Sequence, residues 1–454
     1  MKKEYLRKVI GTALVMAVMA SMTACSGAAA ADAAQTGQSA AAEAAAEETA
    51  AETADISEEK AGDAALTETS QKTVSETAED LSDYFTDRDL EQSPDLTDAV
   101  TCEVKDGEDI TITKEGVYVL KGEASEVTVI VEADDEAKVQ LVLDGVTVTN
   151  TDAPAIYVKS ADKVFVTTTD SENSLSVSGS FTADGDTNTD AVIFSKDDLV
   201  MNGTGTLNIS SSDNGVSSKD ALKITGGTLN VTSSADALEA NDGIYVADGT
   251  VTINSGKDGF HAGDSDDTTI GDIYIAGGTI KVNAADDGIQ GTTVVRIAGG
   301  TIFVAAAEGI EGTDVEIDGG TITVEASDDG INASAKSDAC PVTLVINGGS
   351  LTVSMAAGDT DALDSNGSLY INGGTVDISA QFAFDYVTDG AINGGTVTVN
   401  GSQVTQLSNS MMGGGGMRGG MQGGMKGGMK GQGGGRMKGG RPSESSQEGT
   451  EETF

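Results

Sequence analysis

The residues most suited to chemistry are acidic ones in short phrases of Asp or Glu, then Gly or Ala, then an apolar residue. The predicted metal ligands in or beside these phrases are Asp242, Asp258, Asp286, Asp287, Glu311, Asp328, Asp329 and Asp364. Oxygen ligands presented at turns suit Ca²⁺, so the phrases predict a calcium site. The alternative is a solvated acidic face on which Asp-Gly supplies only turn geometry.

Tyrosine and arginine residues indicate where a sugar chain could bind. Tyr245 and Tyr274 occupy the same position in two adjacent repeats, Arg296 follows one repeat later, and Tyr370 has this position further on. Apolar residues flank this position on both sides, so its side chain should point outward. Stacked rings beside a guanidinium would suit an acidic sugar chain. The alternative is ordinary packing between exposed tyrosines of neighbouring strands.

Catalysis is a second interpretation of the same residues. A calcium-dependent lyase needs a basic residue near the metal, and Arg296 is the only arginine within the repeats. A hydrolase needs two carboxylates at a fixed separation, but acidic residues are too numerous here for pairs to be informative. His261 lies near Asp258 and could act as a base, although a single His without a partner motif is typically a surface residue. We therefore expect a non-catalytic protein.

Composition and charge narrow the function classes. The chain has 454 residues with 59 Gly, and its 73 acidic against 26 basic residues give a net charge of −47. Such a chain would repel phosphate, so we expect no nucleic-acid partner. An apolar fraction of 38% is too high for a wholly disordered protein. A Gly-rich, Asp-rich all-β protein with disordered attachments fits these values.

An internal repeat predicts the fold. A Gly that precedes Thr or Ser returns at positions 205, 227, 249, 278, 300, 320, 349, 374 and 395, a period of about 22 residues with longer insertions. Apolar residues alternate with period two on either side of this Gly corner, which indicates strands joined by turns. The Leu/Asn ladder of leucine-rich repeats is absent from the sequence. We predict an all-β, right-handed parallel β-helix, a solenoid with about 22 residues per coil.

Stacked coils have a consequence for the acidic phrases. They would bring like charges to about 5 Å from one another, where the carboxylates repel. No basic residue recurs in the phrases to pair with them. The carboxylates therefore need a cation, which strengthens the prediction of Ca²⁺. A structural or adhesive rod that uses calcium only for rigidity is a further alternative.

The two ends of the chain differ from the repeats. Residues 1–25 have a basic start, a short apolar run and Met22-Thr23-Ala24-Cys25, as in a lipoprotein signal peptide in which Cys25 is lipidated. Residues 26–80 form a predicted disordered Ala/Glu/Thr tether, and residues 406–454 a predicted disordered, cationic Met/Gly-rich tail. Residues 81–109 should form an N-terminal cap before the β-helix of residues 110–405.

Localisation and partners follow from these ends. A lipid on Cys25 would hold the protein on the extracellular face of the cytoplasmic membrane, with no other membrane contact. Cys102 and Cys340 could pair across the fold or stay separate thiols, and separate thiols are favoured. We expect a monomer.

Several phrases together resemble a known family. They are Ile112-Thr-Lys-Glu-Gly-Val-Tyr-Val-Leu-Lys-Gly122, Val139-Gln-Leu-Val-Leu-Asp-Gly-Val-Thr-Val148, Pro154-Ala-Ile-Tyr-Val-Lys-Ser-Ala-Asp-Lys163, Ser217-Ser-Lys-Asp-Ala-Leu-Lys-Ile-Thr-Gly-Gly227 and Ser327-Asp-Asp-Gly-Ile-Asn332. Over about residues 95–405 the chain resembles the bacterial carbohydrate-binding parallel β-helix family, long carried as a domain of unknown function.

The resemblance implies a calcium-loaded surface protein that binds cellulose or acidic, pectin-like plant polysaccharides. It places calcium ligands at Asp258, Asp287, Asp329 and their neighbours. The chain departs from the family pattern at Glu308, where Glu replaces Asp, and after Asp220 and Asp361, where Ala replaces Gly.

Overall fold

The computed structural model describes residues 81–358 and 360–409, and these residues form an all-β solenoid. The predicted signal peptide with Cys25, the tether and nearly all of the tail lie outside the described residues. Within the described part, the one helical element is a short 3-10 turn at Leu81–Asp83, and no helix is long and apolar enough to cross a membrane.

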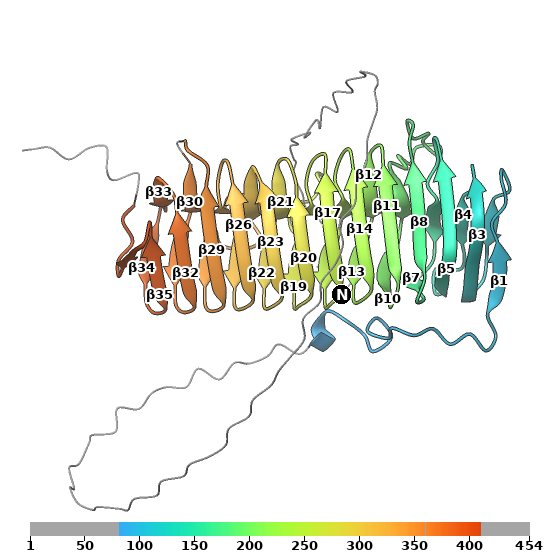
Figure 1. Cartoon of the computed structure of the whole chain (residues 1–454), viewed down its shortest axis with the longest axis horizontal. Helices are drawn as coiled ribbons and strands as arrows, with labels where there is room; N and C mark the ends of the chain where they lie inside the picture. The colour runs from blue at the N-terminus through green and yellow to red at the C-terminus, as the bar shows by residue number, and fades with distance from the viewer. Residues whose placement is uncertain (1–80, 359, 410–454) are drawn as a thin grey trace, which may run out of the picture. The chain divides into compact units, whose positions relative to one another are not determined.

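Each coil of the solenoid contributes up to three strands, which stack on those of the neighbouring coils as three faces (Figure 1). The first face contains β1 Val100–Glu103, β3 Gly116–Ser125, β5 Lys138–Asn150, β7 Lys163–Thr168, β10 Asp198–Gly203, β13 Ala221–Ile224, β16 Gly243–Val246, β19 Asp272–Ile275, β22 Val294–Ile297, β25 Asp314–Ile317, β28 Thr343–Ile346, β31 Ser368–Ile371 and β34 Asp389–Ile392.

The second face follows the Gly corner of each repeat. It contains β8 Glu172–Val177, β11 Thr206–Ser211, β14 Thr228–Ser233, β17 Thr250–Ser255, β20 Thr279–Asn283, β23 Thr301–Ala306, β26 Thr321–Ala326, β29 Ser350–Met355, β32 Thr375–Ser379, β35 Thr396–Val399 and β36 Ser402–Val404. The long strand β5 pairs with β7 through its first half and with β8 through its second, which joins the first two faces into one sheet.

The third face is a separate sheet. It contains β2 Ile110–Ile112, β4 Val129–Glu132, β6 Ile156–Ser160, β9 Ala191–Ser195, β12 Asn214–Ser218, β15 Leu238–Ala240, β18 Phe260–Ala262, β21 Asp287–Gly291, β24 Glu308–Gly312, β27 Ile331–Ala333, β30 Asp361–Ser365 and β33 Phe382–Phe384. Apart from the terminal pair β35–β36, which is antiparallel, strands of neighbouring coils pair in parallel throughout the described residues.

The repeat positions stack in register. One column on the second face consists of Thr206, Thr228, Thr250, Thr279, Thr301, Thr321, Ser350, Thr375 and Thr396. Each of these residues follows a Gly of the predicted corner, and at Gly300 a φ of 95° places the backbone where side chains are strained. The all-β fold and the parallel stacking are thus confirmed, while the right-handed winding stays a prediction.

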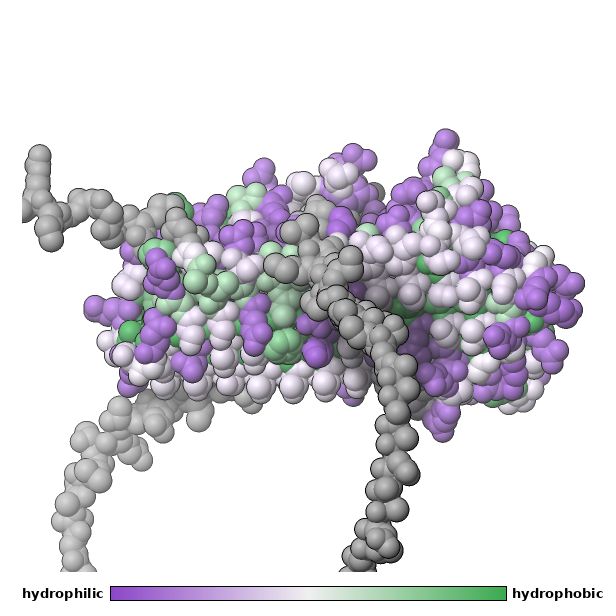
Figure 2. Space-filling view, turned by 45° about the horizontal axis from the view of Figure 1, so that its top comes forward, coloured by the Kyte–Doolittle hydropathy of each residue, from purple (hydrophilic) through white to green (hydrophobic). Residues whose placement is uncertain are grey.

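The interior is filled by apolar ladders. The residue after each corner Thr or Ser is buried, in the column Leu207, Leu229, Val251, Ile280, Ile302, Ile322, Leu351, Val376 and Val397. Burial of each such side chain contributes about 1.5–3 kcal/mol. On the side shown in Figure 2, hydrophilic residues cover much of the surface and apolar ones appear in small patches.

Residues 81–92 cross the outside of the first face. Asp89 is fully buried there, with its carboxylate 3.1 Å from Lys163 Nζ and 3.2 Å from Lys223 Nζ. Gln92 Nε2 donates to the carbonyl oxygen of Thr225 at 3.0 Å. Asn202 Nδ2 donates to the carbonyl oxygen of Glu91 at 3.1 Å, so the segment contacts β7, β10 and β13. Cys102 and Cys340 are both free thiols.

The ladder predicts a contrast between two neighbouring residues of β23. Ile302 is buried in the interior, whereas Phe303 is only partly buried and points outward. Ile302→Ala should lower the free energy of unfolding by about 2–5 kcal/mol because it leaves a cavity. Phe303→Ala is the matched control, and urea denaturation measures both. Equal losses in the two variants would contradict the assignment of the core.

Candidate functional site

Six acidic residues stand one per coil where the chain enters the third face. This acidic column consists of Asp236, Asp258, Asp287, Glu308, Asp329 and Asp361. Asp236 Oδ1 accepts a hydrogen bond from the backbone N–H of Asp258 at 2.9 Å, and Asp258 Oδ1 accepts one from that of Asp287 at 3.1 Å. The same bond joins Asp329 Oδ1 to the N–H of Asp361 at 3.1 Å. Backbone donors thus fix the direction of these carboxylates.

A second polar column lies three residues further along each coil. It consists of Glu239, His261, Gln290, Glu311, Asn332 and Asp364. Its side chains point away from the apolar core, because the residue before each of them, such as Leu238 or Ile289, belongs to the interior. The two columns together place two polar side chains on each coil.

The columns bring acidic groups into three close clusters. They are Asp236 with Asp258 and His261, Asp258 with Asp286 and Asp287, and Asp287 with Glu308 and Glu311. Within each cluster the candidate ligand atoms lie within 4.8 Å of one another. Two oxygens that share a Ca²⁺ at 2.3–2.6 Å lie no more than about 5 Å apart, so the spacing fits this ion.

Four of the eight predicted ligands belong to these clusters, namely Asp258, Asp286, Asp287 and Glu311. Asp329 and Asp364 belong to the columns, and Asp328 directly precedes the acidic column. Asp242 does not lie in it. It aligns with Asp220 at the corner before the first face, because Ala221 pairs with Gly243. A coil can therefore contain two acidic phrases, one in the acidic column and one at the corner before the first face. The sequence alone did not distinguish these two positions.

Asp236, Glu308 and Gln290 were not among the predicted ligands, although Asp236 and Glu308 belong to the acidic phrases. A signal for them was present, since an acidic residue is followed three positions later by Glu, His, Gln, Asn or Asp in six successive coils. His261 was expected at the surface, and this was wrong. It is 8% exposed, and its Nδ1 lies 2.5 Å from Asp258 Oδ2.

The expectation that basic residues do not pair with the acidic phrases was also wrong. Three lysines from the adjoining turns form ion pairs there, each at a different coil. They are Lys219 with Glu239 at 3.1 Å, Lys257 with Asp236 at 2.9 Å and Lys336 with Glu311 at 2.6 Å. Between these pairs, no Lys or Arg of the described residues forms an ion pair with Asp258, Asp287 or Glu308. The centre of the column therefore has the largest uncompensated negative charge.

The electrostatics of this centre follow from burial. Burial raises the pKa of Asp258, Asp287 and Glu308, and the charges of neighbouring carboxylates raise these pKa values further. Towards the C-terminal end, burial raises the pKa of Asp329 to about 6, and burial with the charge of Asp329 raises that of Asp364 to about 7. All these carboxylates can be ionised together at neutral pH only beside a cation.

One further donor points to a cation. Asn332 is 8% exposed, and its Oδ1 has no hydrogen-bond partner among the described residues. Its Nδ2 donates to Glu308 Oε2 at 3.0 Å. A buried amide oxygen without a donor costs free energy, and Ca²⁺ would satisfy it. The residues therefore fit a hard divalent cation at Asp287, Glu308 and Glu311, with the amide of Asn332 beside Glu308.

The predicted sugar platform is aligned as expected but is not exposed. Tyr245, Tyr274 and Arg296 stand in register on β16, β19 and β22. The two rings are only 1% and 3% exposed, because Tyr84 stacks on Tyr274 with ring centroids 4.1 Å apart and lies 5.5 Å from Tyr245. The prediction of exposed rings at these positions was wrong, since a segment outside the repeats covers them.

The other two predicted sugar-binding residues are engaged with acids. Arg296 Nε lies 2.7 Å from Asp318 Oδ2 and 3.3 Å from Glu316 Oε2. Tyr370 Oη donates to Asp389 Oδ2 at 3.1 Å and stands three coils from Arg296. The four residues therefore do not form one aromatic surface.

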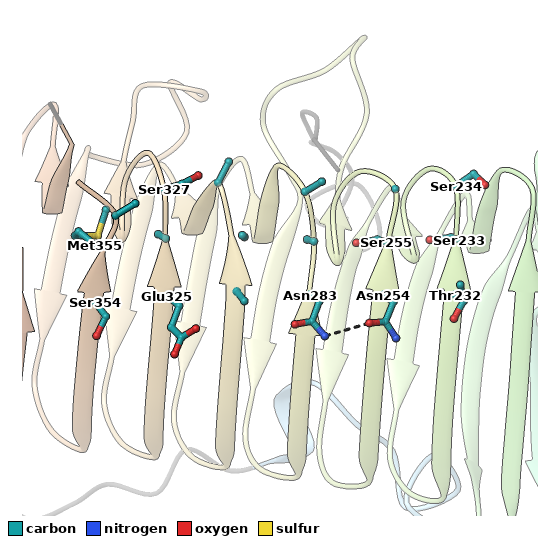
Figure 3. Close-up of a pocket in the computed structure, with 18 residues that line it drawn as sticks. Thr232, Ser233, Ser234, Asn254, Ser255, Asn283, Glu325, Ser327, Ser354 and Met355 are labelled. Carbon is teal, nitrogen blue, oxygen red and sulfur yellow. Dashed lines mark hydrogen bonds between the residues drawn. The ribbon is translucent and has the colours of Figure 1, made fainter. Parts of the chain in front are cut away.

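A groove runs across six coils at the corner between the second and third faces (Figure 3). Its volume is about 1130 Å³. One edge is a column at the ends of β14, β17, β20, β23, β26 and β29, namely Thr232, Asn254, Asn283, Ala305, Glu325 and Ser354. Asn283 Nδ2 donates to Asn254 Oδ1 at 3.1 Å.

The floor of the groove is made of small residues. Ala, Ser and Gly predominate there, including Ser255, Gly256, Ala285 and Ala306. In one coil Ala285 is followed directly by Asp286 and Asp287, and in the next Ala307 is followed by Glu308. The groove therefore runs beside the acidic column, and its hydroxyl and amide edge lies opposite the carboxylates.

The raised pKa values predict how stability depends on pH without metal. Asp329 and Asp364 have folded-state pKa values of about 6 and 7, above the unfolded value of about 3.9. The folded state then binds more protons, so stability in EDTA should fall as pH rises from about 4 to about 7. Asp364→Asn should remove about 1–2 kcal/mol of this fall, a value discounted for partial exposure. Denaturation at several pH values measures it, and an unchanged slope would contradict the raised pKa.

Comparison with known proteins gives the family. A family model described as "Carbohydrate-binding domain-containing protein" matches residues 106–380 and 305–430. A protein of the same description from Acetivibrio thermocellus is 34% identical over 122 residues, which are 26% of this chain and 43% of the relative. The match thus spans less than half of that relative.

A solved structure of a polysaccharide lyase-like protein from C. thermocellum, in a gadolinium derivative, has 22% identity and a TM-score of 0.32, covering 68% of this chain and 99% of that chain. The two segments matched by the family model span well over half of the sequence. The chain belongs to the family of carbohydrate-binding domain-containing proteins.

Proposed function

We propose that this protein binds plant-wall or acidic, pectin-like polysaccharide at the cell surface without cleaving it, and that calcium stabilises it. The observation that supports the proposal is the groove of about 1130 Å³ in a chain of a carbohydrate-binding family. The groove follows the stacking axis, so an extended sugar chain can lie along it and contact several coils. Each coil then contributes a similar set of contacts.

The groove offers the contacts that sugars use. Its edge carries the amides of Asn254 and Asn283, the carboxylate of Glu325 and hydroxyl groups, which bond sugar hydroxyls. Its floor of alanine and other small residues leaves room for pyranose rings. The lining contains no Lys or Arg among the described residues. Neutral sugars therefore fit the groove itself, and acidic sugars need a cation beside it.

Calcium has a structural role in this proposal. Asp287, Glu308 and Glu311 would hold it, with the amide of Asn332 beside Glu308 and with Asp258 and Asp286 as a neighbouring set. The ion would supply positive charge to a column whose buried carboxylates repel one another. The backbone hydrogen bonds to Asp236, Asp258 and Asp329 already hold these side chains along the stack.

The positions of Arg296 and His261 in the fold favour binding over cleavage. Arg296, the arginine considered for a lyase, is on the first face and is paired with Glu316 and Asp318, while the acidic column is on the third face. His261, the residue considered as a base, is buried and therefore has little access to a sugar chain. It is hydrogen-bonded to Asp258 inside the column.

A substitution in the groove tests the binding function. Ala305→Trp should fill the groove and weaken binding of a soluble neutral β-glucan by tenfold or more, measured by calorimetry with calcium present. Thr323→Trp is the control, because Thr323 lies on β26 outside the groove lining. The same mixtures are assayed for new reducing or unsaturated ends. New reducing or unsaturated ends would support an enzymatic function. Absence of binding by the wild-type protein would instead favour a structural rod.

Calcium is tested by neutralising two of its proposed ligands. The wild-type protein should gain about 2.7 kcal/mol at a calcium concentration of 100 times Kd. The double variant Glu308→Gln/Glu311→Gln should lose most of this gain, yet melt higher than the wild type in EDTA because it removes crowded charges. Glu325→Gln, in the groove edge, should keep the gain. A full calcium response in the double variant would refute these ligands.

A further inference from the structure

Three lysines form a row on the third face, in the coils that precede the acidic column. Lys159 lies within β6, Lys196 follows β9, and Lys219 follows β12. Val158 pairs with Ser195 and Ser195 with Ser218, so the lysines stand one per coil. Neighbouring strands are about 4.8 Å apart. The row therefore presents three ammonium groups at regular spacing along the stack.

Two buried aromatic rings support the lysine row. Tyr157 and Phe194 are in register, with ring centroids 5.7 Å apart and only 5% and 1% exposed. Lys159 Nζ lies 4.9 Å from the Tyr157 centroid, and Lys219 Nζ lies 5.5 Å from that of Phe194. Lys196 Nζ lies 5.9 Å from the Tyr157 centroid. These cation–π contacts position the ammonium groups, which stay partly exposed.

The lysine row already contacts one carboxylate of the protein. Asp184, on the loop between β8 and β9, places Oδ2 2.7 Å from Lys159 Nζ and 3.1 Å from Tyr157 Oη. Its side chain is 52% exposed. Hydrogen bonds from Lys159 and Tyr157, and then the charges of Lys159 and Lys196, lower the pKa of Asp184. The row thus has the geometry and the positive charge to hold a carboxylate. A carboxylate of a bound ligand could replace that of Asp184.

The ion pairs within the protein do not involve every lysine of the row. Lys219 Nζ lies 3.1 Å from Glu239 Oε1. Lys196 forms no ion pair with any residue in the described part of the chain. In a chain of net charge −47, this row is a local exception to the negative surface. Short-range contacts with these ammonium groups, and not the field of the whole chain, would therefore hold a ligand with negative groups.

We propose that Lys159, Lys196 and Lys219 bind the carboxylates of an acidic polysaccharide, a uronate chain that runs along the stack, and that Asp184 competes for the same place. The proposal rests on the proposed polysaccharide-binding function and adds a site outside the groove. A uronate chain carries one carboxylate per sugar, so a chain that lies along the stack brings several carboxylates to the row. The ammonium groups can then pair with these carboxylates, and Tyr157 Oη, which donates to Asp184, can donate to the sugar that displaces it.

The test uses the mature protein at a constant, saturating calcium concentration. Calorimetry measures binding of polygalacturonate, of its methyl-esterified form and of a neutral β-glucan. Lys196→Gln should weaken polygalacturonate binding about tenfold, the loss of one charge-assisted contact. Asp184→Asn should strengthen it several-fold, since the competitor loses its charge. Neither variant should change binding of the esterified or the neutral chain.

Two control variants make the test specific. Lys281→Gln removes an exposed lysine of β20 on the second face and should behave as the wild type. Lys196→Arg keeps the charge and should keep most of the affinity. Melting curves check that each variant is folded. Equal affinities of Lys196→Gln and Lys281→Gln for polygalacturonate, or unchanged binding after esterification, would overturn the proposal.

The outcomes also separate this proposal from the function on which it rests. If the wild type binds the neutral glucan and Ala305→Trp does not, the groove function stands whatever the lysine variants do. If in that case polygalacturonate is not bound, the lysine site alone is refuted. If neither chain is bound, both proposals fail.

Discussion

In-register stacking of parallel strands is the constraint on which the rest of this structure depends. Each position of a coil lies about 4.8 Å from the same position of the next coil, so every residue type in the repeat becomes a column. For Ile302 and its equivalents the result is a continuous apolar interior. For Asp258, Asp287 and Glu308 it is a row of buried carboxylates that repel one another. The same geometry that stabilises the core therefore creates the demand for a cation.

The protein meets this demand in different ways along one face. In its early coils Lys159, Lys196 and Lys219 supply positive charge. In the middle, His261 and Gln290 provide neutral hydrogen-bonding groups beside the acidic column. Around Glu308, Lys336 pairs with Glu311 and Asn332 donates to Glu308, and the cluster of Asp287, Glu308 and Glu311 still presents carboxylate oxygens at a spacing that fits a divalent ion. A gradient of charge along a single face follows, with the groove of small residues at its edge.

Periodic features could be predicted from the sequence because they repeat. The Gly corners, the apolar ladders and the acidic phrases each recur many times, so one interpretation explains all copies. Features that occur once could not be predicted in this way. The segment that buries Tyr245 and Tyr274 lies before the repeats and has no periodic signature. Asp242 was misplaced because its phrase resembles those of another corner. Cavities depend on the side-chain volumes of six coils together, so the groove had no local signal.

The last strand changes what the end of the solenoid can do. A parallel solenoid ends in strands whose outer N–H and C=O groups can accept a strand from another molecule, and long fibres grow by this route. On the second face, β36 turns back and pairs antiparallel with β35, through Val397 with Val404 and Val399 with Ser402. The hydrogen-bonding groups on the outer edge of β35 are therefore occupied within the chain. On this face the outermost strand of the described residues is then the three-residue β36, which runs against the direction of the stack and offers another copy only a short edge for end-to-end polymerisation.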